Sequence, residues 1–306
     1  MRILAAFGIV YAHMNAPFWE VGYLALGLFV TLTTLLAAFS AETRDFGRFM
    51  RGRFWRIILP WLVACVVYSG LLAWQQRTVA RLWQFTEWQS LLVGSYWHLW
   101  FLPFIVLTAP IAFWSARRLN TRRRVAQAVM PMAILGASAL AFHDNGQMDA
   151  PWIQWACATI PFFYGLLLAA AKRQNMHLAP LVFICVATGI PLYFWHSMTA
   201  CFLLGAAFLF EVFWRLQLRG RWLPLLGQLS FGIYLVHPLM MVVWQKLSGG
   251  AVPPALGAVV VFILSLGGAV LLEILWARVM PRRGAQPRVQ APMPDPAPPH
   301  GPNLAA

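Results

Sequence analysis

Arg2 and His13 stand at the two ends of the first apolar segment, RILAAFGIVYAH, eleven residue steps apart. Eleven steps of about 100° return to within about 20° of the starting direction, so both side chains share one helix face. The rise is about 16 Å, which predicts Arg2 at the cytoplasmic surface and His13 around or beyond mid-membrane. A buried neutral histidine can accept a hydroxyl proton or carry a transferred group, and a hydrogen-bonded packing role is the alternative.

A second group of bases precedes the third apolar segment, in FGRFMRGRFWRIILPW at residues 46–61. Arg53 and Arg56 are three residues apart, a spacing that points both side chains the same way on an α-helix, and Arg51 lies close by. Guanidinium groups bind phosphate through paired hydrogen bonds, so the cluster suits a phosphorylated cofactor facing the cytosol. An ordinary basic loop of a membrane protein is the alternative.

Ser230, Tyr234 and His237 form a polar stripe in GQLSFGIYLVHP, at residues 227–238. Their i, i+4, i+7 spacing puts them on one face of an otherwise apolar helix. Polar groups inside a membrane face the bundle interior or a wet cavity, so the stripe is a candidate substrate-binding surface.

The stretch SYWHLWFLPF, at residues 95–104, carries a histidine among tryptophans. His98 lies between Trp97 and Trp100 at the expected outer end of the fourth apolar segment. His98 and Trp97 are therefore candidates for binding a substrate from the outer side, and an interfacial anchor is the alternative.

The elements that position these residues must be membrane helices. Of 306 residues, 60% are hydrophobic and only 10% are charged, which excludes an ordinary water-soluble domain. The apolar segments lack the alternation of a membrane barrel, which predicts an all-α, polytopic membrane helix bundle of about ten transmembrane helices. These segments lie at 2–18, 20–40, 56–74, 97–116, 125–142, 151–171, 178–196, 199–216, 222–245 and 254–277.

The distribution of bases orients the bundle. With the N-terminus in the cytoplasm, 20 of the 23 Lys and Arg residues fall on the cytoplasmic side, which predicts that both termini are cytoplasmic. The formal net charge of +14 does not indicate nucleic-acid binding, because the bases sit in short loops where they set topology and attract anionic membrane lipids.

Composition divides the chain into a membrane domain at 1–280 and a Pro-rich cytoplasmic tail at 281–306, expected to be disordered. No internal repeat of fixed period is visible. The cysteines have no spacing typical of a disulfide or metal site and are interpreted as small apolar residues. They are Cys65, Cys157, Cys185 and Cys201.

Taken together, the four stretches resemble the acyltransferase-3 family of membrane acyltransferases. The shared features are Arg-x10-His in the first segment, Arg-x-x-Arg before the third, HLWFL at an outer end, and SFGIYLVHP near the end. The resemblance covers nearly the whole chain up to the tail. It implies a multi-pass protein of the bacterial inner (plasma) membrane that O-acylates carbohydrate, moving acyl groups other than amino-acyl groups.

In that family a ten-helix domain moves an acyl group, often acetyl, from cytosolic acyl-CoA to a hydroxyl of a surface polysaccharide, periplasmic glucan or glycolipid. The resemblance implies that Arg2 and His13 are the essential first-segment pair and that Arg53 and Arg56 meet the acyl donor. Acyl-CoA is then a donor substrate, and no permanently bound cofactor or metal is expected.

The sequence departs from the family pattern in two places. Family members carry a short lead before the arginine, where Met1 stands here, and an FFxLSGF stretch in the second segment, which here reads GLFVTLTTLLAAF. Some relatives carry a fused hydrolase-like domain. None is seen here, so a second transfer step is expected to need a partner protein.

Two other classes of function remain open. A transporter or flippase for a lipid-linked saccharide would also use polar stripes and basic inner loops, but it should show an inverted-repeat hydropathy pattern, which is not visible. A scaffold subunit would have no need of a histidine aligned with an arginine on the first segment.

Overall fold

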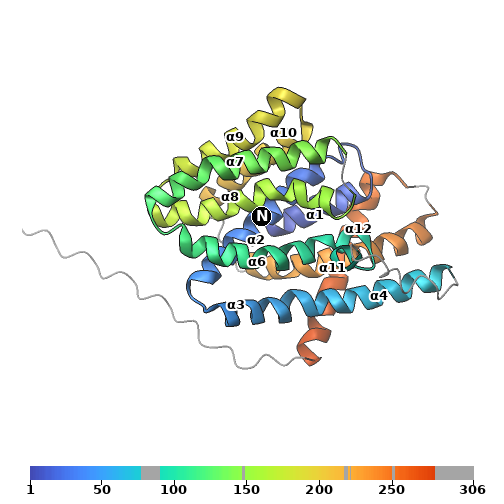
Figure 1. Ribbon diagram of the computed structural model, residues 1–306. Coiled ribbons are helices and arrows are strands. Elements are labelled where there is room, and N and C mark those ends of the chain that lie inside the picture. Colours follow the sequence, from blue (N-terminus) through green and yellow to red (C-terminus); the bar gives the residue numbers. More distant parts are fainter. Residues whose placement is uncertain (77–89, 147–148, 217–219, 221, 250–251, 280–306) are drawn as a thin grey trace, which may run out of the picture.

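The computed structural model describes residues 1–76, 90–146, 149–216, 220, 222–249 and 252–279, and all regular elements in these ranges are helices (Figure 1). Among these residues, nine helical stretches are long and apolar enough to cross a membrane, and α1 is a shorter apolar helix. The predicted all-α membrane bundle is therefore confirmed. The tail at 281–306 lies outside the described residues.

In chain order the elements are α1 Arg2–His13, α2 Val21–Glu42, α3 Phe46–Arg53, the π-helical turn η1 Phe54–Ile58, α4 Leu59–Gln76, α5 Ser90–Val93, the 3-10 turn η3 Trp97–Trp100, α6 Phe101–Arg118, α7 Arg122–Asp144, α8 Trp152–Gln174, α9 Leu178–Trp195, α10 Met198–Leu216, α11 Trp222–Ser248 and α12 Pro254–Val279.

The first helix ends earlier than the apolar pattern predicts. The segment expected at 2–18 is helical only to His13, because Asn15 and Phe18 adopt left-handed φ angles of 51° and 61°. Pro17 between them cannot donate a backbone hydrogen bond. Twelve residues span about 18 Å, which is less than the hydrocarbon thickness of a bilayer.

Close packing of α1 against α2 fixes the depth of Arg2. A Cβ added to Gly8 would lie 2.7 Å from the Cβ of Ala25, and the next small pair along this antiparallel contact joins Ala12 to Gly22. Continuing the register places Arg2 level with Leu32, about ten residues or 15 Å before the end of α2. Figure 1 likewise shows the N-terminus midway along the bundle, which corrects the expectation of Arg2 at the membrane surface.

The helix carrying the arginine cluster begins earlier than expected. Asp45 caps α3, and its carboxylate accepts a hydrogen bond of 2.9 Å from the backbone N–H of Arg48. That bond lowers the pKa of the Asp45 carboxyl below its ordinary value. Helix then continues through η1 into α4, so residues 46–55, expected to precede the third segment, are part of one helical stretch.

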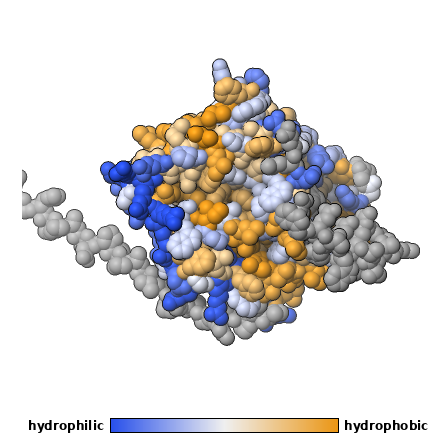
Figure 2. Space-filling view, viewed as in Figure 1, coloured by the Kyte–Doolittle hydropathy of each residue, from blue (hydrophilic) through white to orange (hydrophobic). Residues whose placement is uncertain are grey.

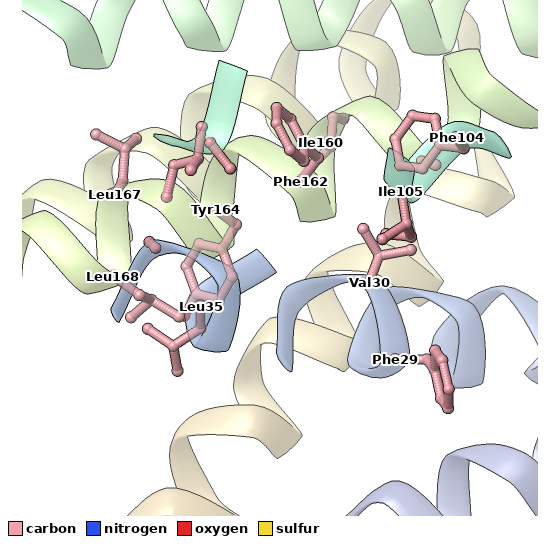
Figure 3. Packing of buried hydrophobic residues seen from close by; sticks show 14 of the residues in the cluster. Phe29, Val30, Leu35, Phe104, Ile105, Ile160, Phe162, Tyr164, Leu167 and Leu168 are labelled. Carbon is pink, nitrogen blue, oxygen red and sulfur yellow. The ribbon is translucent and has the colours of Figure 1, made fainter. Parts of the chain in front are cut away.

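Much of the core lies where α2, α6 and α8 meet, and Figure 3 shows apolar side chains of these helices, among them Leu35, Phe104 and Phe162. The rings of Phe104 and Phe162 meet edge-on with centroids 6.0 Å apart. Gly165 of α8 allows the closest approach. A Cβ at this position would lie 2.7 Å from the Thr31 carbonyl oxygen and 2.9 Å from the Thr34 Cβ. Membrane helices pack through such small residues.

Gly165→Ala is expected to lower the free energy of unfolding by about 1–3 kcal/mol, because backbone atoms of α2 must move to admit the methyl group. Unfolding of the detergent-purified protein measures the change. Gly189→Ala in α9 is the matched control, since nothing lies within 4 Å of a Cβ there and alanine favours helix. Equal stability of both variants would contradict the packing argument.

Basic side chains gather at one end of the bundle, over the α2–α3 and α6–α7 turns, whereas hydrophobic residues cover much of the middle (Figure 2). The α8–α9 turn and the C-terminal end of α10 lie at this same end of the bundle. This agrees with the prediction that these loops lie on one side of the membrane. The contacts that join them are Arg117 Nη2 to the Arg44 carbonyl at 2.8 Å, Arg122 Nε to the Gln174 carbonyl at 3.0 Å, Arg173 to Glu42 at 2.8 Å, and Lys172 Nζ over the Trp214 ring at 3.0 Å.

Candidate active site

Three histidines that are far apart in sequence meet in the bundle interior. His13 ends α1, His98 lies in η3 and His237 lies in α11. The rings of His13 and His237 stack with centroids 5.3 Å apart, and the ring of His98 meets His237 edge-on at 5.2 Å. Three of the four sequence stretches therefore converge on one group of imidazoles.

Two tyrosines hold the segments that carry these histidines. The Tyr234 hydroxyl donates a hydrogen bond to the His98 carbonyl, which fixes η3 against α11. The Tyr68 hydroxyl of α4 donates to the Leu235 carbonyl at 2.6 Å, and the Tyr68 ring lies 5.3 Å from that of His98. Both tyrosines are buried, so these bonds lie away from water and position the imidazoles firmly.

The hydrogen bonds of the imidazoles differ. His237 Nδ1 lies 2.8 Å from the Tyr234 carbonyl, which can only accept, so Nδ1 carries the hydrogen and Nε2 presents a lone pair. His237 Nε2 and both ring nitrogens of His98 are buried without a hydrogen-bond partner among the described residues. A buried imidazole without partners is costly in a purely structural role, which marks His98 as a functional candidate.

A cavity of about 430 Å³ reaches this group. Its wall includes His13, His98 and Tyr234, together with the exposed residues Asn15 and Trp19. The wall is largely apolar with a few convergent polar groups, as is typical of small-molecule binding sites.

The predicted polar stripe of α11 is divided by the fold. Only Tyr234 belongs to the cavity wall. Ser230 is buried and donates to the Gly227 carbonyl of its own helix at 2.8 Å, and His237 is fully buried behind His13 and His98. Common spacing on one helix face does not ensure a common environment, because neighbouring helices cover parts of that face. Of the three residues, the structure therefore places only Tyr234 on the wall of this cavity, and substrate contact by Ser230 and His237 stays a prediction.

The HLWFL stretch lies inside the bundle at its histidine. His98 is only 2% exposed and is surrounded by Tyr68, Tyr96 and His237, which excludes an interfacial-anchor role for His98. Trp97 begins η3, and its side chain lies outside the described part of the structure. Substrate contact by Trp97 stays a prediction.

The arginine cluster is distorted by the π-helical turn. Arg53 ends α3 and Arg56 lies in η1, where each hydrogen bond spans five residues, so the helix turns less per residue and the pair diverges. The Arg53 guanidinium lies 3.6 Å over the Phe49 ring, whereas Arg56 and Arg51 are exposed. The expectation that Arg53 and Arg56 point the same way is therefore corrected.

The cluster and the imidazoles lie at different levels of the bundle. Fifteen residues separate Arg53 from Tyr68, the neighbour of His98, which corresponds to about 22 Å of helix. Arg53 Nε is buried and has no hydrogen-bond partner among the described residues. The chain thus has a group of arginines near its basic end and a group of imidazoles far along α4.

Tyr234→Phe is expected to destabilise the protein by about 1–3 kcal/mol, because the buried His98 carbonyl loses its donor. Movement of η3 should also lower the maximal rate of a reaction at the imidazoles more than it weakens binding of a ligand at the arginines. Thermal unfolding and steady-state kinetics of the purified variant measure both effects. An unchanged rate with reduced stability would leave Tyr234 a packing residue.

Tyr68 is a site residue that the sequence patterns did not single out. It is a lone hydroxyl-bearing aromatic in an apolar stretch, ACVVYSG, and such interruptions are weak signals unless a partner is known. Its partners on α11 and η3 are 167 and 30 residues away in the chain. Tertiary contact alone reveals its role.

Comparison with known proteins identifies the family. A family model described as an acyltransferase domain matches residues 1–274, nearly all of the helical part of the chain. Neither a curated protein nor a solved structure matches the chain significantly. With its long apolar helices and this match, the chain belongs to the acyltransferase-3 family and is an integral membrane acyltransferase.

Proposed function

We propose that this protein O-acylates a carbohydrate, moving an acyl group, most simply acetyl, from cytosolic acyl-CoA to a surface or periplasmic glycan or glycolipid of a bacterium. The bacterial inner membrane is the corresponding location, with both termini in the cytoplasm. The observation that carries the proposal is the cavity that joins His13 and His98 to the exposed residues Asn15 and Trp19. The acceptor can then reach the imidazoles through this cavity.

His13 is the proposed base. It takes the proton of the acceptor hydroxyl as the oxygen attacks the carbonyl carbon of the thioester. The new C–O bond forms, the C–S bond breaks, and the departing CoA thiolate receives the proton from the imidazolium. In a variant of this route His13 first carries the acyl group itself, and the hydroxyl then displaces it.

The arginines supply the proposed donor site. Arg51 and Arg53 belong to α3 and Arg56 to η1, and α3 lies toward the basic end of the bundle (Figure 1). Guanidinium groups there can bind the phosphates of CoA. The pantetheine arm would extend from there toward the imidazoles, along α4. Arg2, which lies level with the middle of α2, is the residue proposed to meet this arm between the two ends.

A chromosomal deletion tests the proposal. Mass spectrometry of the surface and periplasmic glycans of the deletion strain should show the loss of one acyl mass increment, restored by the wild-type protein and not by His13→Gln. A transporter would instead change the amount or location of a saccharide with its acyl pattern intact. That result, or complementation by both proteins, would refute the proposed activity.

A further inference from the structure

We infer that the part of the cavity wall formed by Gln154, Tyr23, His143 and Trp19 is a subsite for a neutral sugar residue. This inference rests on the proposed function and extends it, because it names the residues that select the acceptor. All four side chains belong to the wall of the cavity that also holds His13 and His98.

Gln154 provides the first observation. Its Oε1 atom is buried and has no hydrogen-bond partner among the described residues, although the side chain lies on the cavity wall. A buried amide oxygen without a donor loses a hydrogen bond that water would have made. A ligand that donates a hydrogen bond into the cavity would restore it.

His143 adds a second polar group to the same wall. Its Nδ1 lies 3.0 Å from Oδ1 of Asp144, and because a carboxylate accepts, Nδ1 carries the hydrogen of this bond. An unpartnered amide oxygen beside an imidazole suits a ligand that carries several hydroxyl groups, since each hydroxyl can both donate and accept a hydrogen bond.

Aromatic rings complete the subsite. Trp19 and Tyr23 have ring centroids 6.1 Å apart, and Tyr23 meets His143 edge-on at 5.6 Å. Trp19 is 46% exposed, so a large apolar surface with a polar edge stands at the accessible end of the cavity. A pyranose presents C–H faces to such rings and hydroxyl groups at its rim, which matches both kinds of group on this wall.

The position of the subsite sets the reacting hydroxyl. A sugar held at Gln154 and Tyr23 lies along the same cavity as His13, so a hydroxyl on that sugar or on its neighbour in a glycan can reach the base. The subsite therefore determines which saccharide is acylated, whereas the imidazoles perform the transfer.

Steady-state kinetics in lipid nanodiscs test this inference, with acetyl-CoA as donor and, as acceptor, the unacylated saccharide isolated from the deletion strain. Gln154→Leu should raise the KM for saccharide about tenfold, the loss of one hydrogen bond, and leave the KM for acetyl-CoA unchanged. Gln154→Glu keeps an acceptor oxygen and should retain more saccharide affinity than Gln154→Leu. Trp19→Ala, in an exposed turn, should raise the same KM without loss of folding.

Gln127→Leu is the matched control, because Gln127 is exposed on α7 and does not line this cavity. An unchanged saccharide KM in Gln154→Leu, or equal losses for saccharide and acetyl-CoA, would overturn the subsite while leaving the proposed function intact. If the wild-type protein transfers no acetyl group to the saccharide, the proposed function itself fails and the subsite fails with it.

Discussion

His13→Gln is expected to lower acyl transfer by about a hundredfold or more, because glutamine retains much of the size and hydrogen bonding of histidine but cannot accept a proton at neutral pH. His13 lies on the cavity wall and stacks on His237, so the substitution removes the proposed base at the point where the cavity meets the imidazole group. Transfer by the purified protein in liposomes, with acyl-CoA and acceptor supplied, measures the loss.

Two measurements separate catalysis from folding in this variant. The thermal unfolding temperature and the affinity for CoA should stay close to those of the wild-type protein. His177→Gln is the matched control, because His177 is exposed before α9 and lies outside the cavity wall. Near-normal acylation by His13→Gln would return His13 to a packing role.

The double change Arg53→Lys and Arg56→Lys is expected to weaken CoA binding about tenfold or more. Lysine keeps the positive charge but loses the planar fork that pairs with phosphate oxygens, and a charge-assisted hydrogen bond contributes about 1.5–3 kcal/mol. Calorimetric titration of CoA into the protein in nanodiscs measures the effect. Membrane insertion should be unaffected, since the charges that set topology remain.

The single variants distinguish the two arginines. Arg53 is half-buried, packs on Phe49 and has an unpartnered Nε, whereas Arg56 is exposed, so Arg53→Lys should account for the greater part of the loss. Arg122→Lys is a suitable control, because it changes a base at the same end of the bundle. CoA binding by the double variant at wild-type strength would refute the donor site.

The sequence by itself determined the class of fold and most helix positions. Length and apolarity are sufficient for this, since a backbone inside a bilayer must satisfy its own hydrogen bonds and a long apolar segment can do so only as a helix. The later segments, such as those expected at 178–196 and 254–277, match α9 and α12 within a few residues. Short motifs also identified the family before any contact was known.

Where a local signal competed with apolarity, the sequence pattern misplaced an element. The first segment stays apolar beyond His13, yet left-handed φ angles at Asn15 and Phe18 end the helix and leave Arg2 midway along α2. The π-helical turn between Arg53 and Arg56 likewise breaks an α-helical spacing argument. Hydrophobic periodicity indicates which side chains are buried. It does not show where a helix ends or where a π-helical turn replaces an α-helical one.

Only the tertiary structure decided which polar residues form the site. His13, His98 and His237 meet because α1, η3 and α11 pack together, and Tyr234 bonds a carbonyl 136 residues away. In the same packing Ser230 bonds to its own helix and does not belong to the wall of this cavity. In lipid, apolar side chains gain little from choosing one helix neighbour over another, so close contacts at small residues and interhelical hydrogen bonds select the arrangement, and these act between positions that no local pattern connects.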